Sequence, residues 1–284
     1  MTKNLRPKLK DITICAVDCQ YPLLAAQALT HSNDLCEFNR VILFTDSNCE
    51  SVSNCETIKI DQISSINEYS YFILKKLNEY ISTDFALLIQ WDGFVTNPDS
   101  WSEDFKNFDY IGAKWEWHKD GKNIGNGGFS LRSKKLLEAT HSDSFVFISD
   151  DPEDNQICRT YHNFLKTNNQ IAFATEEMAD IFSYERTLPN YPTFGFHGLF
   201  NIWRHYTDEQ VAQLILQLNP KTLNSRELLE LWLQYFLLRK FILIKLIYQK
   251  VKSINTIEEL KTRVSPYSND KNFPEFFLNI CEKL

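Results

Sequence analysis

The segment LIQWDGFV, residues 88–95, holds the side chains with the clearest chemical potential. Gln90 and Asp92 stand two positions apart, so in a strand they face the same side, and Gly93 relaxes the backbone behind them. A carboxylate and an amide oxygen in this place suit a divalent cation that also holds a diphosphate. The alternative interpretation is an ordinary Asp-Gly turn that ends the strand.

Two adjacent glycines follow Asn126 in the segment IGNGGFSLRSKK. Gly127 and Gly128 permit a close approach of the backbone to a ligand. Nearby, Trp115 or Trp117 offers a flat face on which a sugar ring can stack. A glycine turn beside core aromatic residues is the alternative interpretation.

The stretch SDDPEDNQICRTY contains two adjacent carboxylates, Glu153 and Asp154, directly after Pro152. This order predicts a helix whose first turn contains Pro152. One interpretation is structural, because carboxylates at a helix start favour the dipole, which would lower the pKa of Asp154. The other is a general base that takes the proton of an attacking hydroxyl.

His197 lies between apolar residues in TFGFHGLFNIWRH, a segment too rich in glycine and aromatic residues to be helical. A lone histidine of this kind is usually a core or loop residue whose hydrogen bonds are satisfied. Its imidazole could instead complete the metal site that begins at Asp92. The residues alone leave both interpretations open.

The elements that would position these side chains alternate between strands and helices. Strands are predicted at residues 11–19, 40–47, 56–61 and 84–95, and helices at residues 23–32 and 66–81. This order predicts an α/β fold with a Rossmann-like, mixed sheet flanked by helices. Ligands of such sheets bind beyond the carboxyl ends of the strands, where Asp18, Asp46 and Asp92 stand.

From about Thr207 the pattern becomes helical, which predicts a first domain of residues 1–206 and an all-helical C-terminal extension of residues 207–284. The apolar faces of these helices are too extensive to face water, so we expect them to pack on the first domain or on a second copy of the chain. These faces include Leu228, Leu231, Trp232, Tyr235 and Leu238.

Several lysines of the extension are expected to face anionic lipid headgroups, in peripheral contact with a membrane. These are Lys240, Lys245, Lys250 and Lys252. The most apolar stretch, residues 228–247, is interrupted by four charged residues, which argues against a membrane-spanning helix.

Composition narrows the possible partners and the compartment. The 284 residues are 43% hydrophobic, enough for a sizeable core, and the net charge of -7 disfavours nucleic acid. Seven cysteines without the spacing of a disulfide scaffold favour reduced thiols and a cytoplasmic location, without structural zinc. The N-terminus lacks the apolar core of a secretory signal.

These segments together resemble a bacterial family, the DUF5672 proteins, which are assigned to the GT-A superfamily of glycosyltransferases. The resemblance lies in TDFALLIQWDGFV, FKNFDYIGAKW, IGNGGFSLRSKKLLEA, EDNQICRTY, FATEEMADIFSYE and FGFHG. It is nearly continuous from about residue 68 to 198, residues 12–67 fit the opening of the fold more loosely, and the resemblance does not extend beyond residue 206.

The resemblance implies a nucleotide-sugar donor, most often a uridine diphosphate sugar, with Mn²⁺ or Mg²⁺. Asp92 takes the place of the last acid of the DxD motif and forms the metal site with His197, while Gln90 replaces the first acid. Asp154, or less favourably Glu153, becomes the general base of an inverting transfer. The implied acceptor is a glycan or lipid-linked hydroxyl, in the synthesis of surface polysaccharide or glycoconjugates.

The donor and the acceptor each have an expected set of contact residues. For the donor these are Asp18, Lys75, Gln90, Trp91 and Asp92. For the acceptor they are Trp115, Asn126, Gly127, Gly128 and Phe129.

Two other classes of protein share some of these features. A sugar nucleotidyltransferase normally carries a glycine-rich loop after its first strand, but the sequence here, AVDCQYPLL, has no glycine. A carbohydrate- or nucleotide-binding module would need neither the acidic pair nor the late imidazole. Hydrolysis of the donor in the absence of acceptor separates an enzyme from such a module.

Overall fold

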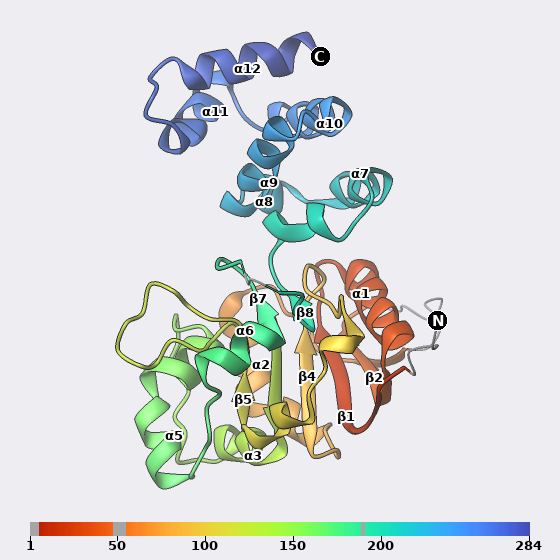
Figure 1. The fold of residues 1–284 in the computed structure, drawn as a ribbon, viewed down its shortest axis with the longest axis vertical. Coiled ribbons are helices and arrows are strands. Elements are labelled where there is room, and N and C mark those ends of the chain that lie inside the picture. The colour runs from red at the N-terminus through yellow and green to blue at the C-terminus, as the bar shows by residue number, and fades with distance from the viewer. Residues whose placement is uncertain (1–5, 48–54, 189–190) are drawn as a thin grey trace. The chain divides into compact units, whose positions relative to one another are not determined.

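A computed structural model describes residues 6–47, 55–188 and 191–284. The chain divides into two compact units, Met1–His197 and Gly198–Leu284 (Figure 1). The division falls earlier than the predicted boundary after residue 206. The physical reason is the 3-10 helix η5 (Leu199–Arg204), whose Leu199 and Ile202 are buried and which packs on α9 (Arg226–Leu237) of the second unit.

The first unit is built on a six-stranded sheet of order β3-β2-β1-β4-β6-β5. β1, β2, β3 and β4 run parallel, while β6 is antiparallel to both β4 and β5. The strands are β1 (Lys8–Val17), β2 (Glu37–Thr45), β3 (Glu56–Lys59), β4 (Phe85–Ile89), β5 (Tyr110–Ile111) and β6 (Phe129–Ser133). The predicted α/β class with a mixed sheet and a helical C-terminal part is confirmed.

The central strands are apolar on both faces because helices or loops cover both. In β4, Ala86, Leu87, Leu88 and Ile89 are all fully buried. The strand nevertheless ends at Ile89, so the predicted extension of this strand to residue 95 is wrong. The segment after Ile89 turns away at the carboxyl edge of the sheet.

Helices α1 and α2 pack on the strands of this sheet. Helix α1 (Pro22–Leu35) contacts β1 and β2. Helix α2 (Ile66–Lys75) starts with a capping box between Ser65 and Glu68, and its Phe72 and Ile73 join a core with Phe44 and other strand residues. The remaining helices of this unit are α3 (Lys134–His141), α4 (Glu153–Asn155), α5 (His162–Asn168) and α6 (Glu176–Phe182).

A second, two-stranded parallel sheet brings two distant segments together. β7 (Ser183–Tyr184) pairs with β8 (Gly195–Phe196), and Tyr184 lies opposite Phe196. Glu185 and His197, the residues that follow these two strands, therefore lie side by side.

The C-terminal unit is all helical, as predicted. After η5 it contains α7 (Asp208–Gln217), α8 (Pro220–Leu223), α9, α10 (Phe241–Lys252), α11 (Ile257–Val264) and α12 (Phe273–Lys283). Capping boxes that begin at Thr207 and Thr256 start α7 and α11. Among the described residues, no helix is long and apolar enough to cross a membrane.

The C-terminal unit has its own hydrophobic core. Trp232 packs edge-on against Phe277 of α12, with ring centroids 4.7 Å apart, and its indole nitrogen donates to the carbonyl of Ile244. The apolar face of α9 is therefore covered within the unit, and the expectation that another domain or subunit must cover it is wrong. Leu238 is the exception, since it remains 39% exposed.

The four lysines expected to face lipid headgroups have partners within the chain. Lys240 pairs with Asp208 at 2.9 Å, and Lys252 pairs with Glu282 at 2.6 Å. Lys245 and Lys250 donate to the carbonyl oxygens of Leu284 and Leu216. Each of the four lysines thus has a partner within the chain, while Lys240 and Lys252 remain exposed, so their contact with a membrane stays a prediction.

Candidate active site

The candidate site forms where the carboxyl ends of β1 and β4 meet. Because the two strands are parallel neighbours, Asp18 after β1 and Asp92 after β4 come close together. Asp18 accepts hydrogen bonds from the backbone of Gln20, at 2.7 Å, and Tyr21, which shape the turn into α1. Burial raises the pKa of Asp18 to about 6, the two backbone bonds oppose the rise, and Asp92 adds to it.

A tight turn, and not strand alternation, orients Gln90 and Asp92. The backbone N–H of Gly93 donates to the carbonyl of Gln90 at 3.1 Å. Trp91, at the tip of this turn, packs edge-on against Tyr21 with ring centroids 5.3 Å apart. The predicted neighbourhood of Gln90 and Asp92 is thus present, but a different backbone geometry produces it.

His197 lies at the centre of the polar cluster. Its Nε2 is 3.1 Å from Oε1 of Gln90 and 3.5 Å from Oδ1 of Asp92. Its Nδ1 is 3.1 Å from Oε1 of Glu185. Gln90 and Asp92 come from the segment after β4, whereas the small β7–β8 sheet places Glu185 beside His197.

The two carboxylates control the charge of the imidazole. Burial disfavours the charged ring, but Asp92 and Glu185 outweigh it and raise the pKa of His197 well above its usual value. For Glu185, burial opposes ionisation and His197 outweighs it, so the pKa of Glu185 is lowered. Without another cation, the cluster is held together by an imidazolium between carboxylates.

The glycine pair allows two side chains to approach the backbone. A Cβ on Gly128 would collide with the ring of His197, and a Cβ on Gly127 would collide with the carboxylate of Glu153. Asn126, at a φ of 65°, shapes this segment by accepting from the N–H of Gly128 at 2.9 Å. The glycines are therefore needed for packing at the site itself.

The two adjacent carboxylates have different surroundings. One guanidinium nitrogen of Arg132 donates to both oxygens of Glu153 at 3.0 Å, and both side chains are buried. Burial disfavours the charge of Arg132, but Glu153 outweighs it and raises the pKa of the guanidinium. Glu153 is therefore engaged in a buried ion pair.

Asp154 is half-buried and is held by the backbone. Its Oδ2 accepts from the N–H of Gly127 at 3.0 Å, and its Oδ1 accepts from the N–H of Asn155 at 2.8 Å. Burial raises the pKa of Asp154, while the Gly127 bond and Arg132 oppose the rise. The expectation that the helix dipole lowers this pKa is wrong, because desolvation is the larger effect at this short helix, which begins at Glu153.

Three of the other predicted site residues are engaged in hydrogen bonds or packing within the fold. Lys75 donates to the carbonyls of Thr140, Ser142 and Phe145. Phe129 is fully buried on β6 among aromatic rings. Trp115 is 7% exposed and packs on Gly125, whereas Trp117 stacks on it with a centroid distance of 6.2 Å and remains 55% exposed.

Sequence reasoning did not single out three residues that complete the cluster. Glu185 holds His197, Arg132 neutralises Glu153, and the hydroxyl of Tyr69 accepts from Nε2 of Gln90 at 3.2 Å. Glu185 is the last residue of the motif FATEEMADIFSYE. The family resemblance therefore included this residue, but it did not indicate that the residue contacts His197. Arg132 had a weaker signal, since it is the one charged residue of the buried strand FSLRS.

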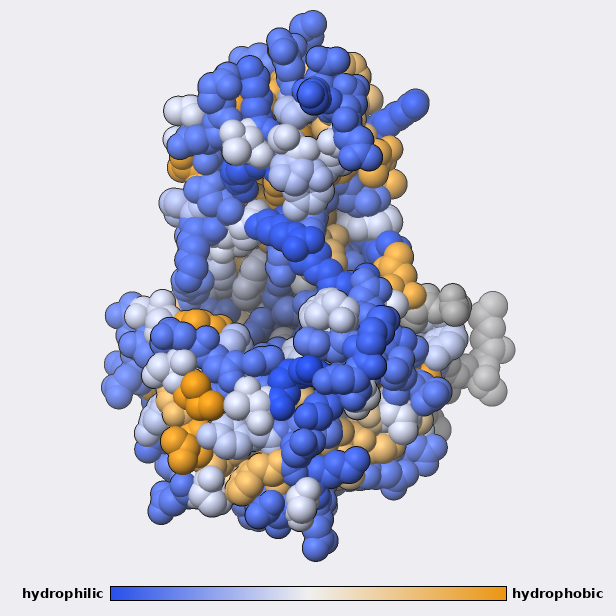
Figure 2. Space-filling view, turned by 90° about the vertical axis from the view of Figure 1, so that its left-hand side faces the viewer, coloured by the Kyte–Doolittle hydropathy of each residue, from blue (hydrophilic) through white to orange (hydrophobic). Residues whose placement is uncertain are grey.

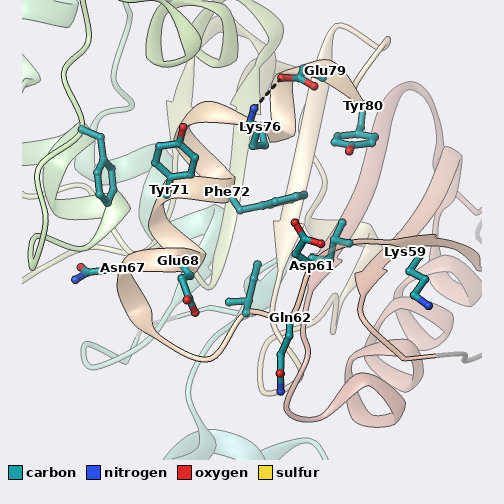
Figure 3. A pocket seen from close by; sticks show the side chains of 13 residues that line it. Lys59, Asp61, Gln62, Asn67, Glu68, Tyr71, Phe72, Lys76, Glu79 and Tyr80 are labelled. Atoms are coloured by element: carbon teal, nitrogen blue, oxygen red, sulfur yellow. Dashed lines mark ion pairs between the residues drawn. The ribbon is translucent and has the colours of Figure 1, made fainter.

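A cavity of about 850 Å³ lies beside α2, between that helix and the segment that follows β3 (Figure 3). Tyr71, Phe72 and Tyr80 line it together with Asp61 and other polar side chains. None of Asp92, Asp154 and His197 lines this cavity. The cavity is therefore distinct from the polar cluster, although Tyr69 of the same helix reaches Gln90.

Asp92 and His197 are side chains of the kinds that bind divalent cations, and Gln90 adds an amide oxygen beside them. In an octahedral Mg²⁺ site the ligands lie at about 2.0–2.1 Å from the ion and hence about 3 Å from one another. The separations from Nε2, 3.1 Å to Gln90 and 3.5 Å to Asp92, are close to this value, and they are also those of a hydrogen bond and an ion pair. In the described part of the chain, no group of three or more His, Cys, Asp or Glu side chains could hold a metal ion.

Three solved structures of glycosyltransferases are similar to this chain. One, involved in glycosylation of the major capsid of PBCV-1, is 12% identical, with 66% of this chain and 91% of that chain covered and a TM-score of 0.41. GlyE of Streptococcus pneumoniae, in its apo form, is 15% identical, with coverages of 80% and 63% and a TM-score of 0.43. The mannosyltransferase PcManGT of Pyrobaculum calidifontis, solved with GDP-Man and Mn²⁺, is 9% identical, with coverages of 99% and 89% and a TM-score of 0.44.

All three TM-scores are below 0.5, so these similarities assign no function to this chain. No curated protein matches it. The family model described as a protein of unknown function (DUF5672) matches residues 53–197. This range covers just over half of the chain and includes Asp92, Asp154, Glu185 and His197, and the chain therefore belongs to the DUF5672 family.

Proposed function

We propose that this chain is a metal-assisted glycosyltransferase that moves a sugar from a nucleotide-sugar donor to a hydroxyl acceptor with inversion. The observation that carries the proposal is the relation between His197 and Asp154. Gly128 packs on the His197 ring beside Asp92, and the N–H of the adjacent Gly127 binds Asp154. The candidate metal ligand His197 and the candidate base Asp154 thus contact two adjacent glycines of the same segment.

The donor would bind at the carboxyl ends of β1 and β4. Mn²⁺ or Mg²⁺ would be held by Asp92 and His197, with the amide oxygen of Gln90 as a neutral neighbour. When bound, the ion acts as a Lewis acid that stabilises the departing nucleoside diphosphate. Glu185 would position His197 by accepting from Nδ1–H, which directs Nε2 toward Asp92.

Asp154 would act as the general base. In an inverting transfer the acceptor oxygen bonds to the anomeric carbon, the bond from that carbon to the diphosphate breaks, and its electron pair leaves with the nucleotide. Asp154 would take the hydroxyl proton in the same step. Its raised pKa makes it a stronger base than an ordinary aspartate, and Gly127 holds it in place.

The acceptor side would use Trp117 in place of Phe129. Trp117 exposes 55% of its surface and stacks on Trp115, which packs on Gly125 close to the Asn126–Gly128 segment. An exposed indole face suits the apolar face of a sugar ring. We therefore propose that the acceptor contains a sugar near its reacting hydroxyl.

A screen of nucleotide sugars tests this function. Thermal unfolding of the full chain would be followed with uridine and guanosine diphosphate sugars, each with and without Mn²⁺, because a ligand of the native state raises the Tm. We expect one donor to raise the Tm only with the ion and to be hydrolysed slowly without acceptor. A donor that binds and stays intact would indicate a binding module, and the absence of any Tm shift would refute the donor site.

A further inference from the structure

Helix α2 contacts two separate parts of the candidate site through two consecutive residues. Tyr69 contacts Gln90, which lies beside the proposed metal ligands. Ser70 contacts Glu153, the residue before the proposed base Asp154. Consecutive residues of an α-helix point about 100° apart, so a single helix can reach two different segments.

The hydroxyl of Tyr69 determines which end of the Gln90 amide faces His197. Nε2 of Gln90 donates to this hydroxyl at 3.2 Å, while Oε1 of the same amide lies 3.1 Å from Nε2 of His197. An amide turned the other way would direct its NH2 group at the protonated ring or at a bound cation, and both contacts are unfavourable. The bond to Tyr69 therefore selects the orientation in which the amide oxygen faces the proposed metal site.

The surroundings of Tyr69 keep its hydroxyl neutral and in place. Burial raises the pKa of Tyr69 and Glu153 adds to the rise, whereas the bond from Gln90 and the charge of Arg132 oppose it. The side chain of Tyr69 packs against the core that includes Phe72 of the same helix. The hydroxyl is thus a protonated group held by packing, and it can accept from the amide at any pH near neutrality.

Ser70 acts as a cap for the short helix that contains Asp154. α4 begins at Glu153, and its N-cap residue, Pro152, has no side-chain group that caps it. The N–H of Glu153 donates instead to Oγ of Ser70 at 3.1 Å. On the hydrophilic face in Figure 2 water can satisfy polar groups, but Ser70 is fully buried and Glu153 is 3% exposed. Loss of this Oγ would therefore leave a buried N–H without a partner.

A further contact from α2 holds the loop in front of α4. Asn67, labelled in Figure 3, lies in the first turn of α2. Its Nδ2 donates to Oδ1 of Asp150 at 2.9 Å, and its Oδ1 accepts from the N–H of Asp150 at 2.7 Å. Asp150 has a φ of 63°, a left-handed conformation that is uncommon for residues other than glycine. The chain around the proposed base is thus tied to α2 both before α4 and at its first residue.

We propose that Tyr69 and Ser70 are positioning residues of the site, where Tyr69 orients Gln90 toward the metal and Ser70 fixes the helix start that holds Asp154. This proposal rests on the proposed transferase function. Each residue acts through the group that it contacts. Their loss should therefore change different kinetic quantities, which a general loss of stability would not do.

The test compares Tyr69→Phe and Ser70→Ala in the full chain, since each substitution removes one hydroxyl. The probe is the uridine or guanosine diphosphate sugar that raises the Tm of the wild type with Mn²⁺. Three quantities are measured: the Mn²⁺ concentration for half of this rise, kcat and KM for hydrolysis of the donor, and the dependence of kcat on pH. The matched controls are Tyr71→Phe, at a residue of α2 that is 45% exposed, and Ser64→Ala, just before α2.

Tyr69→Phe should raise the required Mn²⁺ concentration about tenfold, a usual effect of losing a group that orients a metal-site residue. The acid limb of its pH profile should stay in place. Ser70→Ala should lower kcat by roughly 10 to 10²-fold, because a shift of about 1 Å in a catalytic group has effects of this size. Its Mn²⁺ dependence and donor KM should stay those of the wild type, and both controls should match the wild type in every quantity.

The outcomes separate this proposal from the proposed function. A wild type that neither binds nor hydrolyses any donor would refute the transferase, and the positioning roles with it. With an active wild type, unchanged values in both variants, or equal losses in all quantities, would refute the positioning roles alone. An effect in one variant only would refute the role of the other residue.

Circular dichroism verifies that each variant is folded. If Ser70→Ala is unfolded, Asn67→Ala replaces it, because this substitution releases Asp150 in front of α4. Asn67→Ala should then show the same selective loss of kcat. A wild-type kcat in this variant would show that α2 does not position the base.

Discussion

Oε1 of Glu185 lies 3.1 Å from Nδ1 of His197, and this contact determines which ring nitrogen faces Asp92. Glu185 and His197 are placed side by side because they follow Tyr184 and Phe196, which are opposite one another in the β7–β8 pair. The position of the imidazole is therefore set by a small sheet outside the main one.

Replacing Glu185 by Gln should weaken Mn²⁺-dependent donor binding by roughly 10 to 100-fold, the usual effect of losing a carboxylate that orients a metal-binding histidine. Glu185 acts through His197, so the readout is the Mn²⁺ concentration needed to stabilise the donor complex in thermal unfolding. Glu176→Gln, at an exposed acid on α6, is the control. Unchanged Mn²⁺ dependence in Glu185→Gln would exclude this positioning role.

Replacing Asp92 by Asn should abolish metal-dependent donor binding while the fold is retained. Loss of the carboxylate removes the one anionic side chain proposed to ligate the ion, and with it several kcal/mol of stabilisation of the leaving group. Calorimetric titration with donor and Mn²⁺ measures the effect, and circular dichroism verifies folding. Asp84→Asn, an exposed residue at the other end of β4, should bind like the wild type.

Replacing Asp154 by Asn should slow transfer by roughly 10² to 10⁴-fold with nearly unchanged donor affinity. Asp154 is active as the carboxylate, so the rate should rise with pH through its pKa. Because burial raises the pKa of Asp154, this acid limb should lie above the ordinary value of 3.8. The limb should vanish in Asp154→Asn and persist in Asp143→Asn, an exposed acid.

The stereochemistry of the product tests the same role of Asp154. NMR of the product should show an anomeric configuration opposite to that of the donor, as a single displacement requires. Retention of configuration would refute the inverting mechanism. Full activity of Asp154→Asn would return this residue to a purely structural role.

Replacing Glu153 by Gln should destabilise the protein by about 3–5 kcal/mol, because it leaves the buried charge of Arg132 without its partner. Chemical denaturation measures the free energy of unfolding. The double variant Arg132→Met/Glu153→Leu should recover much of the loss, since it removes both charges. Equal destabilisation of the single and double variants would show that the ion pair is not the cause.

Replacing Trp117 by Ala should raise the KM for the acceptor and leave donor hydrolysis unchanged. An exposed aromatic ring that stacks on a sugar contributes ground-state binding, so kcat should change less than KM. Trp117→Phe keeps a flat ring and should recover most of the affinity. If Trp117→Ala has the wild-type KM, the acceptor does not use this face.

The amino-acid sequence determined the order of strands and helices of the first unit as far as β4, and the helical nature of the second unit. These features follow from short-range patterns, such as the apolar run of β4 and the capping boxes at Ser65 and Thr207. The placement of Asp18 and Asp92 at the carboxyl edge also follows, since Asp18 directly follows an apolar strand and Asp92 stands three residues after the end of another.

The tertiary structure decided which of these polar residues touch one another. Gln90 and His197 are 107 positions apart, and only the pairing of β8 with β7 brings the imidazole to the end of β4. Glu153 and Asp154 are neighbours with the same charge, yet only Glu153 meets Arg132, because β6 places that guanidinium on one side of the helix start.

In the C-terminal unit, too, the long-range contacts were decided only by the tertiary structure. The sequence determined that its helices have apolar faces, because a helical period is a local property. Which apolar residues remain exposed depended on how the helices pack: α10 and α12 cover Trp232, while nothing within the unit covers Leu237 and Ile242 to the same degree. Burial is a property of long-range contacts, and a local pattern does not encode them.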